Sequence, residues 1–514
     1  ALLVAMAPAH ARNVTWSSLV DGFWDVATSW GPSVPTTGDN VIIARTGGDP
    51  LTVTYRSDDL SIGALAIHDH HFILTGGRLN VAGPYNHSGT GITTVTGGFL
   101  GLNGSSTLQT LNFSGGNISG AGAASVGSLN WSGGQFGDSE NRRGSMTVSG
   151  VTTIDGTKQL LAHYGYNLNL NGNTTWTAGQ GFITIGYYGD NASTITIGAS
   201  STFNDAGTSS ASSSRGFGSG GAIVNNGTFN RNGLGVTGIG TNILNNGVIN
   251  VNSGMLALHN GGYSTGTVNI AGNATLQVTN GVASFTSGAI RNDGELLASG
   301  GGYIVIDQAA AYSGQGLLRA VNTGQISFLG SIQTDALQID RGTITAGASM
   351  DVNSIDLSGG TLGGTGITHV NTAMHIGCGG GGTTRTLNLN GTTTWAACNN
   401  NSFAITHVNL AAGATFLDAG AGTTNGARTL RGSAFDTTFN NAGTYERNGL
   451  GTTILDSSVQ NTGAILVNGG TLILKQPISL YKTGTSTGLI RVASGATLQI
   501  EGGAFSMDSG TLNN

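Results

Sequence analysis

The sequence predicts an all-β protein that folds as a parallel β-helix (a β-solenoid), with about 20 residues per coil and an N-terminal cap. Three observations lead to this prediction. The composition is typical of short strands and tight turns, apolar residues alternate along the expected strands, and similar turns recur once per expected coil. In such a fold each coil contributes two or three short strands, which pair with the coils above and below.

The composition of the chain favours strands and turns over disorder. Glycine accounts for 89 of the 514 residues, and charged residues make up 9%, against a usual value of about 25%. Hydrophobic residues make up 38%, which is enough to form a buried core. The chain has only six prolines, so nearly every residue has a backbone N–H group that can pair in a sheet. The net charge of −6 provides no electrostatic attraction for nucleic acid, so we expect no nucleic-acid partner.

Residues 1–11 (ALLVAMAPAHA) are typical of the end of a secretory signal peptide, with an A-x-A cleavage site at Ala9–Ala11. We therefore expect a secreted protein whose mature chain begins near Arg12. The alternative is an ordinary apolar N-terminal strand. No later segment reaches the ~18 consecutive apolar residues of a membrane-spanning helix, so we expect no membrane anchor in this chain.

A long repeat supports the solenoid. Three pairs of segments match in the same order: Asn225–Gly235 with Asn441–Gly451, Leu168–Trp176 with Leu387–Trp395, and Ala274–Val278 with Ala496–Ile500. A block of about 220 residues has therefore been duplicated, with residues 168–278 matching residues 387–500. We expect both copies to lie within one parallel β-helix that covers residues 44–514.

A short repeat sets the size of the coil. Phe229 and Ile249 each follow an Asn-Asn-Gly turn, and the same spacing, about 20 residues, separates Tyr445 from Ile465. Apolar residues near them alternate with polar ones, as in strands with one buried face. A sandwich or barrel would instead show hairpin turns at intervals of about 8–12 residues. The recurrence favours the coil, with Asn, Ser and Thr on turns and outer faces.

Residues 12–43 are rich in tryptophan and form the expected cap. Trp16, Trp24 and Trp30 would cover the first coil, whose strands otherwise present an open edge. The alternative is that the three rings form a platform on which sugars stack.

Two motifs in this region carry a resemblance to a known group of proteins. They are G-x-W-D-x-A-x-x-W (Gly22–Trp30) and V-P-x-x-G-D-N-V-x-I (Val34–Ile43), and the repeat segment Leu65–Gly83 follows them. The chain resembles secreted Gram-negative repeat proteins, namely autotransporter passengers and filamentous-haemagglutinin-like adhesins. The resemblance implies a right-handed parallel β-helix at the outer cell surface. The chain shows no counterpart of the C-terminal membrane barrel of a complete autotransporter, so we expect any anchor to lie outside these residues.

The acidic residues do not predict an active site. The chain has 25 acidic residues, of which four are glutamates, and Asp58-Asp59 is the only adjacent acidic pair. Polysaccharide-cleaving β-helices need clustered carboxylates for acid–base chemistry or calcium binding. We therefore identify no catalytic residue and no cofactor, although single carboxylates from different coils could still converge.

The segment His68-Asp69-His70-His71 is the densest group of potential metal ligands. On a strand, His68 and His70 would share one face and could contribute to a zinc site if another coil supplied further ligands. The alternative, which we favour, is a polar strand segment without metal.

Cys378 and Cys398 are separated by the length of one coil, about 20 residues. Equivalent positions in successive coils are about 4.8 Å apart, within the range that a disulfide accepts. A secreted protein would allow oxidation. The alternatives are a Cys378–Cys398 disulfide and two free thiols.

These features favour a non-catalytic secreted surface or matrix protein, adhesin-like or filament-forming. Its expected partners are host-cell or matrix glycans, or further copies of itself. The alternative is a polysaccharide lyase or glycoside hydrolase on a β-helix scaffold.

Overall fold

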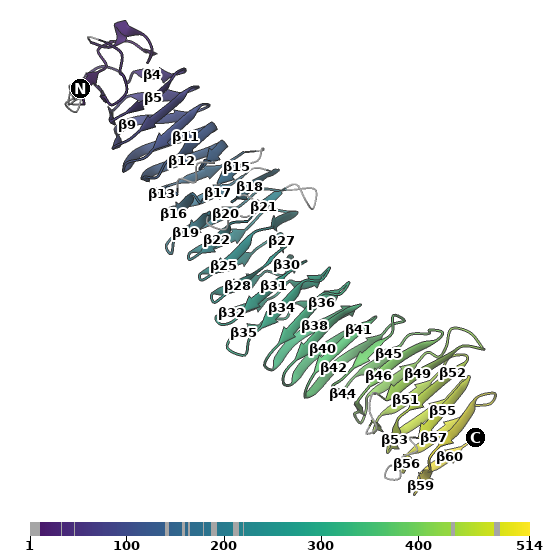
Figure 1. The fold of residues 1–514 in the computed structure, drawn as a ribbon. Helices are drawn as coiled ribbons and strands as arrows, with labels where there is room; N and C mark the ends of the chain where they lie inside the picture. The colour runs from purple at the N-terminus through teal and green to yellow at the C-terminus, as the bar shows by residue number, and fades with distance from the viewer. Residues whose placement is uncertain are drawn as a thin grey trace, which may run out of the picture. The chain divides into compact units, whose positions relative to one another are not determined.

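The computed structural model describes residues 11–31, 33–45, 47–138, 143–156, 160–162, 165–177, 179–186, 193–208, 215–218, 220–432, 437–476 and 484–514. The chain divides into two compact units, 1–257 and 258–514. In each unit short strands follow one another in a regular stack (Figure 1). The expected signal-peptide segment 1–11 lies, except for Ala11, outside the described residues.

Unit 1 is a stack of coils, each with three strands that pair in parallel with the next coil. One column contains β1 (Asn13–Thr15), β3 (Asn40–Ala44), β6 (Ala64–His68), β13 (Ser145–Val148), β16 (Asn167–Leu170), β19 (Thr194–Ile197), β22 (Ala222–Asn225) and β25 (Asn242–Asn245). A second contains β2 (Gly22–Phe23), β4 (Thr52–Tyr55), β7 (His71–Leu74), β14 (Thr152–Ile154), β17 (Thr174–Trp176), β20 (Thr202–Asp205), β23 (Thr228–Arg231) and β26 (Val248–Val251). The third contains β5 (Asp59–Ile62), β8 (Arg78–Val81), β10 (Phe99–Leu102), β15 (Leu160–Ala162), β18 (Gly181–Ile185), β21 (Arg215–Gly218) and β24 (Val236–Ile239). Three long strands take part in more than one column: β9 (Tyr85–Val95), β11 (Ser106–Ser119) and β12 (Ala123–Phe136).

Unit 2 has the same organisation. One column contains β29 (Thr267–Ile270), β32 (Ala289–Asn292), β35 (Ala311–Ser313), β44 (Thr386–Leu389), β47 (His407–Leu410), β50 (Thr438–Asn441), β53 (Ser458–Asn461), β56 (Gly484–Ser486) and β59 (Phe505–Met507). A second contains β30 (Ala274–Val278), β33 (Glu295–Ser299), β36 (Leu317–Val321), β45 (Thr392–Trp395), β48 (Thr415–Asp418), β51 (Thr444–Arg447), β54 (Ala464–Val467), β57 (Leu489–Val492) and β60 (Thr511–Asn513). The third contains β28 (Gly261–Ser264), β31 (Val282–Phe285), β34 (Tyr303–Ile306), β37 (Gln325–Phe328), β39 (Gly342–Ala346), β41 (Gly360–Gly364), β43 (Gly381–Thr383), β46 (Asn401–Ile405), β49 (Ala427–Gly432), β52 (Thr452–Asp456), β55 (Thr471–Gln476) and β58 (Thr497–Gly502).

Apolar residues point into the stack at every second position of the strands. In β19, for example, Ile195 and Ile197 are buried while Thr194 and Thr196 are partly exposed. Successive coils stay in register, so that Phe229 pairs with Ile249 of the next coil. The predicted parallel β-solenoid is confirmed, with about 21 residues per turn. Within the described residues, no helix is long and apolar enough to cross a bilayer.

Asparagine side chains form ladders both outside and inside the stack. On the outer face of unit 1, Asn250 donates to Asn230 (2.8 Å), and Asn230 donates to Asn204 (2.9 Å). Inside, Asn225 is fully buried and donates to Asn245 Oδ1 at 2.7 Å. The expectation that asparagine lies on turns and outer faces is therefore wrong for Asn225, whose side-chain N–H groups donate to the next coil, to Asn245 and to the Val248 carbonyl.

The core of unit 1 also contains charged residues, Asp205, Arg215 and Arg231, all fully buried. Arg215 Nε donates to Asp205 Oδ1 at 3.0 Å, and Arg215 Nη2 forms an ion pair with the same oxygen. Arg231 Nε lies 3.6 Å from Asp205 Oδ2. The Arg215 guanidinium lies over the ring of Trp176, with 3.5 Å between Cζ and the ring centroid. Burial of these charges is tolerated because opposite charges and an aromatic face surround them.

Unit 2 contains a matching group. Arg428 forms an ion pair with Asp418 and lies over the ring of Trp395, with 4.0 Å between Cζ and the centroid. Arg447 Nε lies 3.5 Å from Asp418 Oδ2, and the Tyr445 hydroxyl donates to the same oxygen at 2.6 Å. Burial lowers the pKa of Arg428 to about 10, which leaves the guanidinium charged at neutral pH.

These groups explain why the motif Arg-Asn-Gly-Leu-Gly is present in both copies of the duplicated block. Arg231 Nη2 donates to the carbonyl of Leu234 (2.8 Å), and Arg447 Nη2 donates to the carbonyl of Leu450 (2.7 Å). The glycine that follows Leu234 has a φ of 78°, which requires glycine at this turn. Each buried arginine therefore holds a surface turn from the inside.

Cys378 and Cys398 are joined by a disulfide in unit 2, with 5.6 Å between their Cα atoms. Cys378 follows β42 (Ile367–Ile376) and Cys398 follows β45, and these two strands pair in parallel. The disulfide therefore connects one coil to the next at equivalent positions.

Candidate functional site

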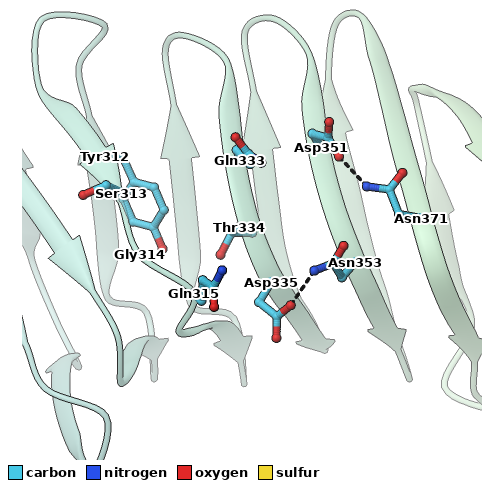
Figure 2. Close-up of a pocket in the computed structure, with 10 residues that line it drawn as sticks. All are labelled: Tyr312, Ser313, Gly314, Gln315, Gln333, Thr334, Asp335, Asp351, Asn353 and Asn371. Carbon is cyan, nitrogen blue, oxygen red and sulfur yellow. Dashed lines mark hydrogen bonds between the residues drawn. The ribbon is translucent and has the colours of Figure 1, made fainter.

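A hollow on the outer face of unit 2 is the best candidate for a binding site. It lies on β35 and on three long strands: β38 (Ile332–Asp340), β40 (Met350–Leu357) and β42. Its volume is about 340 Å³. We call it the polar groove, and its lining residues are Tyr312, Ser313, Gly314, Gln315, Gln333, Thr334, Asp335, Asp351, Asn353 and Asn371 (Figure 2).

The polar groove lies where the long strands turn a corner of the solenoid. In β38 the residues alternate between buried and exposed until Asp335 and Ala336, which both face outward. Between β40 and β42 the register shifts after Val352, because β42 has one extra residue. Such a bulge bends the strand and changes the direction of its side chains. The register of β38 and β40 places Asp335 beside Asn353, and across the bulge Asn371 lies within hydrogen-bonding distance of Asp351.

Two carboxylates in the groove are held by amides of the following coil. Asn353 Nδ2 donates to Asp335 Oδ1, and Asn371 Nδ2 donates to Asp351 Oδ1, each at 2.6 Å (Figure 2). Within the described part of the chain, the second oxygen of each carboxylate makes no hydrogen bond. These oxygens can accept hydrogen bonds from a ligand.

Tyr312 supplies the aromatic part of the groove. Its ring packs edge-on against Phe328, with 5.2 Å between the centroids, and its hydroxyl accepts a hydrogen bond from Asn292 Nδ2 at 3.2 Å. Burial raises the pKa of Tyr312, so its hydroxyl stays neutral at physiological pH. Amides, carboxylates and hydroxyls beside an aromatic ring can form many hydrogen bonds with a ligand rich in hydroxyl groups.

A second hollow of about 520 Å³ begins on the next face of the same strands. We call it the small-residue hollow, because Ala336, Ser354 and Ala373 form its outward-facing floor. Asp356 and His375 pair in register beside this floor. The other residues of its lining are Leu317, Leu337, Gln338, Ile355, Met374, Thr392 and Thr394.

The structure separates the two histidines that were considered as metal ligands. His68 ends β6 and is exposed, whereas His70 is buried within hydrogen-bonding distance of the backbone N–H groups of Arg45 and Leu51. Asp69, with a φ of 60°, forms a turn between them. The expectation that both lie on one strand face is therefore wrong. In the part of the chain that the structure describes, no three His, Cys, Asp or Glu residues are grouped to hold a metal.

The tryptophans of residues 12–43 form a buried cluster. Trp16, Trp24 and Trp30 are 5%, 4% and 2% exposed. Trp30 packs edge-on against both other rings, at centroid distances of 4.9 and 5.0 Å, and its Nε1 donates to the Trp24 carbonyl. Sugars stack on exposed ring faces, so this packing favours a structural role. Stacking also begins before residue 44, since β1 already pairs with β3.

The polar groove is not among the sites that the sequence predicts. Its signal is the even spacing of positions 335, 353 and 371, which places Asp335, Asn353 and Asn371 at successive corners. Local alternation cannot reveal it, because the corner is the point at which alternation stops.

Fold and groove together define the chain as a parallel β-solenoid repeat protein with a polar hollow on one corner. No protein-family model, curated protein or solved structure matches this chain. The resemblance to autotransporter passengers and filamentous-haemagglutinin-like adhesins therefore stays a prediction.

Proposed function

We propose that this protein is a non-catalytic, secreted surface or matrix protein that binds glycans of cells or of the extracellular matrix. The observation that supports this proposal most directly is the polar groove, in which two carboxylates, several side-chain amides and a tyrosine face a hollow large enough for sugar rings. Stacked coils hold these groups in place, so little ordering entropy is lost on binding.

The duplicated block favours a role in adhesion over a role as an enzyme with one active site. Duplication lengthens a solenoid and multiplies its weak contacts, and multivalent binding gains from this through effective concentration. The same argument applies to self-association into filaments. A secreted protein would meet glycans outside the cell. Secretion is also compatible with the disulfide between Cys378 and Cys398, because disulfides persist in oxidising compartments.

A glycan array tests the proposal. The purified protein is applied beside the double variant Gln333→Ala/Asn353→Ala, which removes two outward side chains of the groove. The control is Asn388→Ala/Asn409→Ala, which removes two stacked amides of the same unit outside the groove. We expect wild type and control to bind the same glycans and the groove variant to lose most of the signal. Equal binding by all three proteins, or binding by none, would contradict the proposal.

One observation favours the alternative, a polysaccharide lyase or glycoside hydrolase. Asp356 and His375 lie opposite each other beside an open hollow, and a carboxylate and an imidazole are common general acids and bases. The test is incubation with a panel of polysaccharides in the presence of calcium. Release of reducing or unsaturated ends that is abolished in Asp356→Asn would establish the enzyme and overturn the non-catalytic function.

A further inference from the structure

The polar groove and the small-residue hollow are parts of one surface. Asp335 of the groove is followed directly by Ala336 of the hollow, and Asn353 is followed by Ser354. The same strands, β38, β40 and β42, form both. A ligand that leaves the groove along these strands therefore enters the hollow at the corner.

The floor of the hollow is open over several coils. Ala336 pairs with Ser354, Ser354 with Ala373, and Ala373 with Thr392. Strands in a sheet are about 4.8 Å apart, so these four positions extend over roughly 14 Å. Small side chains along this length leave room for several linked rings. A single sugar would fill only part of the surface.

The charge of the surface restricts the ligand further. Asp335, Asp351 and Asp356 line the two hollows, and neither lining contains lysine or arginine. Two arginines lie in register beside the linings, and both are paired: Arg319, opposite Gln338, with Glu295 at 3.3 Å, and Arg291, opposite Ser313, with Asp293 at 2.7 Å. Acidic glycans would meet uncompensated negative charge at this surface.

We infer that the site takes an oligosaccharide without acidic groups, which lies across the corner and occupies both hollows at once. This inference rests on the proposed glycan-binding function and adds the length and charge of the ligand. His375 also lies in the lining, so all probes are compared at one fixed pH of about 8.

Calorimetric titration with oligosaccharides of increasing length tests the inference. The probes are neutral β-1,4-linked glucose and N-acetylglucosamine oligomers of two to eight units, and galacturonate oligomers of the same lengths. Ala336→Trp fills the floor of the hollow, and Ala404→Trp adds the same ring at another outward position of unit 2. We expect the affinity for at least one neutral series to rise tenfold or more with length. Ala336→Trp should remove that gain, and Ala404→Trp should retain it.

Three outcomes would overturn the inference while the proposed function stands: neutral oligomers that bind independently of length, a length dependence unaffected by Ala336→Trp, or tighter binding of galacturonate oligomers. If no oligomer binds and the glycan array is also negative, both the inference and the proposed function are wrong. Asp335→Asn/Asp351→Asn gives an independent check of charge, because it retains the shape and should raise galacturonate binding.

Discussion

The two buried charged groups, one in each unit, differ in how well the carboxylate is satisfied. Both contain a tryptophan, an aspartate and two arginines, but unit 1 has Phe229 where unit 2 has Tyr445. The rings stack in both units, Phe203 on Phe229 at 5.3 Å and Phe416 on Tyr445 at 5.5 Å. The stacked pair is kept and one hydroxyl is added, while the third ring against the pair is Phe217 in unit 1 and Phe439 in unit 2.

That hydroxyl determines the environment of the carboxylate. Asp418 Oδ2 accepts a hydrogen bond from Tyr445, and Asp418 Oδ1 accepts one from the backbone N–H of Gly420 at 2.9 Å. Among the described residues, Asp205 Oδ2 accepts no hydrogen bond. A buried polar atom without a partner costs free energy. The comparison teaches that a duplicated core can keep the same charges and still differ in stability between the copies.

Removal of the paired arginine should have the largest effect. Arg215→Met and Arg428→Met each leave a buried carboxylate without its main counter-ion, and such losses cost about 3–5 kcal/mol. We expect the loss of stability to be near the upper end of this range for Arg215→Met, because Asp205 then retains only Arg231, 3.6 Å away. The loss should be near the lower end for Arg428→Met, because Asp418 keeps the hydrogen bond from Tyr445.

Hydrogen exchange of β20 and β23 in unit 1, and of β48 and β51 in unit 2, measures the two losses separately. Arg291→Met is the control, because this arginine is mostly exposed and its ion pair contributes less than about 1 kcal/mol. Equal losses in both units would show that the tyrosine hydroxyl does not support the carboxylate.

The disulfide is a second difference between the copies. Cys398 comes three residues after Trp395, whereas Gly179 comes three residues after Trp176. A disulfide that closes a loop of 20 residues stabilises the fold by about 3 kcal/mol. Cys378→Ser/Cys398→Ser should therefore weaken exchange protection of β42 and β45 and leave β17 in unit 1 unchanged. Unchanged protection in β42 and β45 would exclude a stabilising role.

Tyr445→Phe should have an intermediate effect. It removes a hydrogen bond to a charged group in a buried site, and such bonds contribute about 1.5–3 kcal/mol. Burial raises the pKa of Tyr445, so the hydroxyl remains a donor across the physiological range. We expect the free energy of unfolding of unit 2 to fall by about 2 kcal/mol, measured by denaturant unfolding of wild type and variant. A change below about 0.5 kcal/mol would contradict this account, since surface substitutions alone reach that size.

The fold could be predicted from the sequence because its signals are local. Alternation within four residues and turns such as Asn226-Gly227 are visible without knowledge of distant contacts. The charged groups depend on residues that are ten or more positions apart, and an aspartate at the end of a strand also fits a turn. The signal was nevertheless present, because Thr202–Gly207 (TFNDAG) matches Thr415–Gly420 (TFLDAG).

The candidate sites were less predictable than the fold. His68 and His70 satisfied a ligand spacing on an ideal strand, but the turn at Asp69 separates their side chains. Asp335 and Asn353 showed no recognisable motif, because they lie at the corner, where the alternation of buried and exposed residues stops. Irregular backbone, which creates both the separation and the groove, is the feature that periodicity cannot predict.

The reciprocal substitution Phe229→Tyr should have the smallest effect and the opposite sign. It places a hydroxyl where Tyr445 has one in unit 2, and Asp205 Oδ2 has the free lone pairs to accept its hydrogen bond. We expect unit 1 to gain up to about 1 kcal/mol, less than Tyr445→Phe loses, because the surrounding side chains are packed for phenylalanine. Phe113→Tyr is the control, since this buried ring of unit 1 packs against Phe136 and its hydroxyl would displace apolar contacts. If Phe229→Tyr destabilises unit 1 as much as Phe113→Tyr does, the hydroxyl does not reach the carboxylate, and the difference between the two copies must lie in the backbone around Asp205.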